Sequence, residues 1–140
     1  MNNRFTPSYK ENLRELLKNH QGRHACLDSA TNLAEAMAQA DLAITGEGLT
    51  KYETAVLGTP SLIITRSDGD RASHEEFLKA GTALSMDETA TESTSRFAKM
   101  VVDLLKNGPL RRSFSEKGKA LLDTQGPERI WSHIPTEVLS

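Results

Sequence analysis

The sequence contains a single cysteine, few aromatic side chains and no excess of either charge, since 17 basic side chains stand against 19 acidic ones. One cysteine cannot form an internal disulfide, so we expect Cys26 to be a small buried strand residue in a reducing compartment. The balanced charge gives no concentrated basic surface, which argues against nucleic acid and anionic lipid as partners. No apolar run approaches the roughly 20 residues of a membrane span, and the first residues lack the apolar core of a signal peptide. We therefore expect a cytoplasmic chain without a membrane span.

Several motifs for metal, nucleotide and acyl-transfer chemistry are also missing. The sequence has no Cys-x-x-Cys and no Glu-x-x-His spacing around its histidines, which predicts that there is no metal site. It has no Gly-x-Ser-x-Gly elbow and no P-loop, and Lys51 occupies the position of the last glycine of the dinucleotide-binding Gly-x-Gly-x-x-Gly fingerprint. We therefore expect no bound cofactor.

Short β-prone runs alternate with helical patterns along the chain. The four runs are His24–Leu27, Leu42–Thr45, Ser61–Thr65 and Thr82–Met86. The second and third are apolar almost throughout rather than alternating, as in strands of a parallel sheet that is covered on both faces. The sequence therefore predicts an α/β, Rossmann-like fold with about four parallel strands, helices on both faces of the sheet and extra C-terminal helices.

Helical periodicity predicts which side chains face the core. Two early helices are expected to pack on the sheet, the first through Leu13, Leu16 and Leu17 and the second through Leu33, Ala36 and Met37. A later apolar stripe consists of Phe97, Met100, Val101, Leu104 and Leu105. It ends at Asn107-Gly108, and Pro109 begins another helix that continues to Leu122. Residues 125–140 are expected to form a short helix across the domain, with Ile130, Trp131 and Ile134 packed, followed by a tail.

We expect residues 1–140 to form one domain, because the chain has no internal repeat and no linker rich in Gly, Ser or Pro. The first strong element is a helix, whereas a complete nucleotide-binding α/β domain usually opens with a strand and its phosphate-binding turn. The first strand of such a domain is therefore expected to be missing on the N-terminal side. A sheet that lacks a strand has an open edge, which favours a homodimer mate or another partner chain.

The segment Asp41–Pro60 reads as a strand, a glycine turn, a helix and a second turn. Glycine suits a sharp turn or a close approach to a ligand, and the free amides of a helix start bind anions. The predicted nucleotide-binding residues are Gly46, Gly48, Leu49, Thr50 and Glu53.

The expected helix after the glycine turn has two faces. Leu49, Tyr52 and Val56 have the spacing of a buried stripe, which leaves Thr50 and Glu53 on another face, where Glu53 can accept two hydrogen bonds from a ribose diol. The residues alone leave a simpler interpretation open, in which the glycines only turn the chain, Thr50 caps the helix and Glu53 is a solvated charge.

The order Gly48-x-Thr50-x-x-Glu53, followed by Ala55, Gly58 and Pro60 between two hydrophobic strands, resembles the C-terminal domain of GT-B glycosyltransferases. Within that superfamily the chain looks most like the MurG-like group and the UDP-sugar hydrolases of pseudaminic acid synthesis, which are sometimes labelled spore-coat polysaccharide proteins. The resemblance spans about residues 10–122, and its specific part is the central block.

This resemblance implies that Glu53 binds the uridine ribose and that Gly48 and Thr50 bind the diphosphate of a UDP-sugar. In such enzymes the reacting bond lies between two domains, so the chain would be the nucleotide-sugar-binding half of a glycosyltransferase or UDP-sugar hydrolase of cell-surface polysaccharide biosynthesis. Its catalytic residues would belong to a separate N-terminal domain chain, and this chain alone should be inactive. Glu47 departs from the family pattern, which has a small residue there, and brings negative charge to the expected diphosphate.

A second candidate patch follows the third β-prone run, in residues 67–76. Relatives carry Gln and Asn in this loop, whereas this chain offers Arg71 for a phosphate and Ser73 and His74 for sugar contacts. The identity of the sugar is therefore open.

Two other function classes compete with the enzyme half. A degenerate, non-catalytic domain that serves as a binding or protein-interaction module would explain Glu47 and the missing strand. A flavodoxin-like regulatory domain shares the βα rhythm, but it would need acidic residues clustered at strand ends, and Asp28, Asp41 and Asp68 are not so placed.

Overall fold

The computed structural model describes residues 7–18, 22, 33–65, 75, 77–87 and 93–135. The chain divides into two compact units, Met1–Thr31 and Asn32–Ser140, which we describe separately. In the first unit, α1 spans Pro7–Lys18, with Leu13 and Leu17 half-buried and Leu16 67% exposed. The expected strand at 24–27, with Cys26, lies outside the described residues.

In the part of the second unit that the structure describes, three strands form a parallel sheet in the order β1-β2-β3. The strands are β1 (Ala43–Thr45), β2 (Ser61–Thr65) and β3 (Ala83–Asp87). In the register Ile44 pairs with Leu62, and Leu62 pairs with Leu84. Neighbouring parallel strands need a crossover between them, and β1 and β2 are joined by α3 (Thr50–Leu57). The predicted α/β fold is confirmed.

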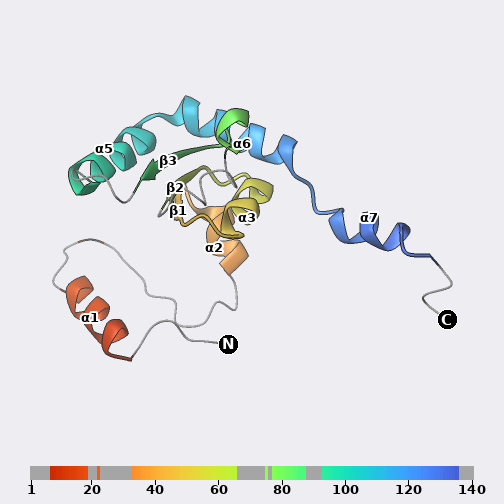
Figure 1. Cartoon of the computed structure of the whole chain (residues 1–140). Coiled ribbons are helices and arrows are strands. Elements are labelled where there is room, and N and C mark those ends of the chain that lie inside the picture. Colours follow the sequence, from red (N-terminus) through yellow and green to blue (C-terminus); the bar gives the residue numbers. More distant parts are fainter. Residues whose placement is uncertain are drawn as a thin grey trace. The chain divides into compact units, whose positions relative to one another are not determined.

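Helices flank this sheet. Besides α3, the second unit contains α2 (Leu33–Gln39), α5 (Ser93–Lys106), α6 (Gly108–Leu121) and α7 (Gly126–Ser132). Figure 1 shows α5 along the sheet beside β3, with α6 continuing from it, while α2 and α3 lie beside β1 and β2. Residues 77–80 are also helical and lead into β3 through Gly81. The part of the chain that the structure describes contains no helix long and apolar enough to cross a membrane.

The hydrophobic core lies between the sheet and the two long C-terminal helices. Leu62, Met86, Leu104 and Phe114 are its buried members, and each is at most 5% exposed. Phe97, Met100 and Val101 of α5 pack against this cluster. The predicted α5 stripe is thus confirmed, except that Leu105 is 46% exposed.

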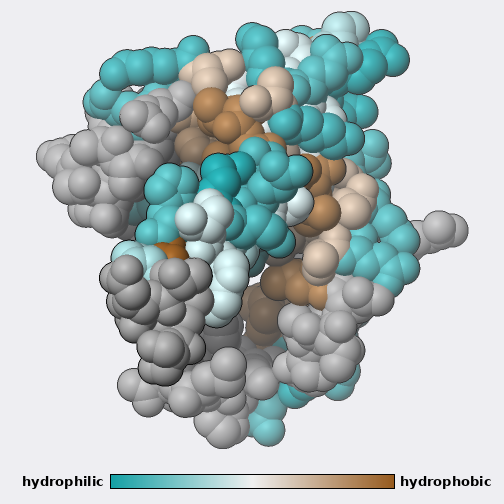
Figure 2. Space-filling model, turned by 90° about the vertical axis from the view of Figure 1, so that its right-hand side faces the viewer, coloured by the Kyte–Doolittle hydropathy of each residue, from teal (hydrophilic) through white to brown (hydrophobic). Residues whose placement is uncertain are grey.

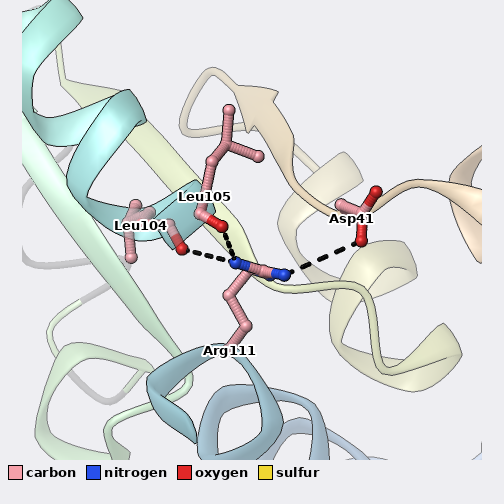
Figure 3. Close-up of polar contacts among 4 residues, drawn as sticks. All are labelled: Asp41, Leu104, Leu105 and Arg111. Carbon is pink, nitrogen blue, oxygen red and sulfur yellow. Dashed lines mark hydrogen bonds and ion pairs between the residues drawn. The ribbon is translucent and has the colours of Figure 1, made fainter. Parts of the chain in front are cut away.

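One arginine joins α5, α6 and the chain before β1. The Nη1 atom of Arg111 donates to the carbonyl oxygens of Leu104, at 2.8 Å, and Leu105, at the end of α5 (Figure 3). Its Nη2 atom lies 3.8 Å from the Asp41 carboxylate. The last carbonyls of a helix lack intrahelical partners, so this guanidinium satisfies two of them and favours the sharp turn into α6.

Two packing expectations are wrong. In α7 no residue is buried, and Ile130 and Trp131 are 69% and 63% exposed, so these side chains do not pack on the domain as predicted. In α2 no residue is buried either, and Leu33 is 44% exposed. The helix α2 contacts α3 rather than burying Leu33 and Ala36 against the sheet. Figure 2 shows exposed hydrophobic areas among hydrophilic ones on one face of the molecule.

Candidate functional site

The candidate site lies where β1 ends and α3 begins. Ligand sites of open α/β sheets form at the carboxyl ends of the strands, and residues 46–49 make up this turn. Leu49 precedes α3 with helical dihedral angles, and its own side chain makes no capping hydrogen bond. The first backbone N–H groups of a helix have no intrahelical acceptor, so the start of α3 offers donors to a ligand. Thr50 does not cap the helix, which removes that part of the simpler interpretation.

The two glycines of the turn are not required by the backbone. Neither Gly46 nor Gly48 has a positive φ, and a Cβ atom built on either would meet no atom within 4 Å. The expectation that glycine makes this turn sharp is therefore wrong, because the backbone angles are open to other residues. The open space beside both residues leaves room for a ligand to approach the backbone, and this role stays a prediction.

The helix α3 buries a different face from the one predicted. Its buried residues are Lys51, Thr54 and Ala55, whereas Leu49 is 77% and Tyr52 is 37% exposed. The predicted stripe of Leu49, Tyr52 and Val56 is wrong because close packing against α6, rather than apolar content, selects the buried face. A Cβ atom added to Gly118 of α6 would lie 2.9 Å from the Ala55 carbonyl oxygen, so only small residues fit there.

The exposed apolar side of α3 forms a groove with α2. The groove has a volume of about 380 Å³. It is lined by Leu33, Ala34, Met37, Tyr52, Glu53, Val56 and Leu57. Its size and its apolar lining with one carboxylate are typical of small-molecule pockets. Glu53 therefore stands at the border between the helix start and an apolar hollow.

The candidate side chains on α3 have different exposures. Thr50 is half-buried and Glu53 is exposed, and their spacing of three residues places them side by side on the helix. The Glu53 amide donates to the Leu49 carbonyl oxygen at 3.3 Å, in the first turn of the helix. The structure thus brings Leu49, Thr50 and Glu53 together with the glycine turn.

The far end of α3 is fixed by Gly58. This residue has a φ of 74°, and its amide bonds to the Ala55 carbonyl oxygen while that of Thr59 bonds to Thr54. The left-handed conformation favours glycine and ends the helix before β2. The Thr59 hydroxyl donates to the Met37 carbonyl oxygen at 2.8 Å, which ties α2 to this second turn.

Lys51 is a buried charged residue of α3 that sequence reasoning did not identify. Its side chain is 1% exposed, and its Nζ atom lies 5.1 Å from the centroid of the Tyr52 ring and 6.0 Å from that of Phe77. The two rings meet edge to face at 5.0 Å. A buried lysine is rare, and aromatic faces stabilise its charge. Apolar periodicity gives no signal for such a residue.

Thr45 is the second residue that the sequence did not reveal. It is the last residue of β1 and is 9% exposed, and its hydroxyl oxygen has no hydrogen-bond partner among the described residues. Most buried hydroxyls are satisfied, and the exceptions concentrate where function or a missing partner explains them. Thr45 directly precedes the exposed Gly46 in the chain.

The remaining candidates stay predictions. Arg71, Ser73 and His74 lie outside the described residues. Glu47 is described and is half-buried, and its expected effect on a diphosphate stays a prediction. Among the described residues no group of three His, Cys, Asp or Glu side chains could hold a metal ion.

Comparison with known proteins gives a distant relative. The chain is 28% identical over 115 residues to the spore coat polysaccharide biosynthesis protein SpsG of Bacillus subtilis strain 168. The match covers 77% of this chain but 32% of the relative, so the chain spans about a third of that protein's length. No family model matches the sequence.

Proposed function

We propose that this chain is the nucleotide-sugar-binding half of a glycosyltransferase or UDP-sugar hydrolase of cell-surface polysaccharide biosynthesis, with the architecture of a GT-B C-terminal domain. The carrying observation is the junction of β1 and α3, where the start of the helix, two open glycines and Glu53 adjoin one another. The likeness to a protein named for spore coat polysaccharide biosynthesis supports the assignment to that process.

Each part of the junction has a role in this proposal. The amides around Leu49 and Thr50 bind the diphosphate, because they point their donors and the positive end of the helix dipole at it. The open space over Gly46 and Gly48 lets the phosphates approach the backbone. Glu53 accepts hydrogen bonds from both ribose hydroxyls, as acidic residues do in dinucleotide-binding folds.

Breaking the bond between the sugar and the diphosphate needs chemical groups that this junction does not supply. A helix start stabilises the leaving diphosphate, whereas an acceptor hydroxyl or water needs a general base. We propose that a second domain or chain carries this base. Without it the chain binds the nucleotide sugar and does not turn it over.

The test is calorimetric titration of the chain with UDP and with 2′-deoxy-UDP. The unmodified chain should bind UDP more tightly than 2′-deoxy-UDP. Glu53→Gln should lose about 1–3 kcal/mol of UDP binding and most of this preference, since the amide cannot accept hydrogen bonds from both ribose hydroxyls. Glu116→Gln is the matched control, because Glu116 is an exposed carboxylate on α6.

Two outcomes would overturn the proposal. If UDP, CMP and ADP all fail to bind at millimolar concentration, the degenerate interaction module becomes the better account. If UDP binds but Glu53→Gln and Glu116→Gln behave alike, the ribose is held elsewhere and the assigned role of Glu53 is wrong.

A further inference from the structure

The short helix α7 presents an exposed apolar side. None of its residues is buried, and its two large apolar side chains, Ile130 and Trp131, are both mostly exposed. A helix of seven residues gains little stability from its backbone alone, and in proteins most helical stability comes from packing of an apolar face. An exposed indole beside an exposed isoleucine is therefore typical of a contact surface, where tryptophan contributes strongly to binding.

The groove between α2 and α3 has complementary properties. It is a hollow of about 380 Å³, large enough for an indole, and its mostly apolar lining carries one carboxylate, that of Glu53. Leu33 of α2 and Tyr52 of α3 leave apolar surface exposed on its two sides. An indole combines a large apolar body with a single N–H donor, which usually finds an acceptor when it is buried. The Trp131 side chain therefore matches the groove both in its apolar body and in its one polar group.

We infer that two copies of this chain associate by exchanging α7, so that Trp131 of each copy fills the α2–α3 groove of the other. Every copy carries both surfaces, so a second copy always brings the knob and the hollow in equal number. A reciprocal exchange closes under a two-fold axis and covers both surfaces of both copies, whereas one-way contacts would leave surfaces open.

The area of this contact sets the expected strength of the dimer. With about 150–250 Å² for a whole aromatic side chain, the exposed parts of α7 and of the groove in two reciprocal contacts amount to roughly 1,000 Å². This area is near the lower limit for a specific interface. We therefore expect a dimer that dissociates in the micromolar range.

Trp131 is the only tryptophan of the chain, so its fluorescence reports on this contact alone. The emission should move to shorter wavelength between roughly 1 μM and roughly 500 μM chain, while sedimentation equilibrium shows the mass change from monomer to dimer. Ala34→Arg places a long charged side chain in the groove and should abolish both changes. Ala38→Arg is the matched control, because Ala38 is also an exposed alanine of α2 but does not line the groove.

Mixing two variants tests whether the contact runs between chains. Ala34→Arg keeps Trp131 but has a blocked groove, whereas Trp131→Ala keeps the groove but has no tryptophan. When Trp131→Ala is added to Ala34→Arg, the tryptophan of one variant should enter the groove of the other, and the emission should shift to shorter wavelength. The double variant, which has neither the tryptophan nor an open groove, should cause no shift when it is added instead.

Four results would overturn the inference. A chain that stays monomeric, with the emission of an exposed tryptophan at every concentration, makes no such contact. Short-wavelength emission at every concentration that mixing does not change would place α7 against its own chain. Equal loss of the dimer in Ala34→Arg and Ala38→Arg would place the interface elsewhere, and species larger than a dimer would contradict reciprocal exchange.

The inference does not depend on the proposed function. The fluorescence and sedimentation experiments contain no nucleotide, because a ribose bound to Glu53 would compete with the indole for the same carboxylate. A failure of the dimer therefore leaves the UDP titration untouched, and a failure of UDP binding leaves the dimer untouched.

Discussion

The contact between α3 and α6 can be tested by adding one methyl group. A Cβ atom on Gly118 would lie 2.9 Å from the Ala55 oxygen and 3.2 Å from its Cα atom. Both atoms are backbone, so relief requires a shift of one helix against the other, and overpacking of this kind costs about 1–3 kcal/mol. Alanine recovers about 1 kcal/mol of helix propensity relative to glycine. We therefore expect Gly118→Ala to lower the free energy of unfolding by up to about 2 kcal/mol.

Urea denaturation followed by circular dichroism measures this change, with Gly108→Ala as the control. A Cβ atom on Gly108, the first residue of α6, would meet nothing within 4 Å, so this variant should unfold at nearly the same urea concentration as the unmodified chain. A Gly118→Ala variant that is more stable than the unmodified chain would show that α3 and α6 are not held at this distance. The reasoning that the contact selects the buried face of α3 would then be refuted.

Two further predictions concern single side chains. Thr45→Val should raise the free energy of unfolding in the absence of ligand by about 1 kcal/mol, since it removes a buried hydroxyl that has no partner among the described residues. Urea denaturation measures this change. A variant less stable than the unmodified chain would show that the hydroxyl is hydrogen-bonded in solution. The pKa of Asp123 is held below its ordinary value by hydrogen bonds from Arg129 and from the Gln125 amide. The ionised Asp123 carboxylate therefore stabilises the start of α7 fully at pH values above the ordinary aspartate pKa. This stabilisation is lost as the pH falls through the lowered pKa. The Gln125 amide resonance should report this loss, and a transition at or above the ordinary aspartate pKa would contradict it.

Much of the sheet could be predicted because its strands are short apolar runs between turn residues. The bounds of β2 agree with the prediction, and β3 begins and ends one residue later than expected. The long helix α5 was predictable from its period, since Phe97, Met100, Val101 and Leu104 all face the core. These elements follow from local pattern, which is where sequence carries the strongest signal.

The orientation of α3 could not be predicted, because it depends on a distant helix. Its apolar side chains suggested one buried face, but Gly118 admits only the small Ala55 at close range. Lys51 then becomes buried in the same orientation, against two rings, one of which comes from residues 77–80. A pattern that counts apolar residues cannot give this result.

The same orientation places the candidate site. With Thr54 and Ala55 turned inward, Tyr52 and Val56 line the groove with α2, and Glu53 lies between this groove and the helix start. A rotation that buried Tyr52 and Val56 would also move the Glu53 carboxylate and expose Lys51. The position of Glu53, the proposed ribose acceptor, therefore depends on how α3 packs against α6, so a variant that loosens α6 from α3 should weaken UDP binding although it touches no ligand.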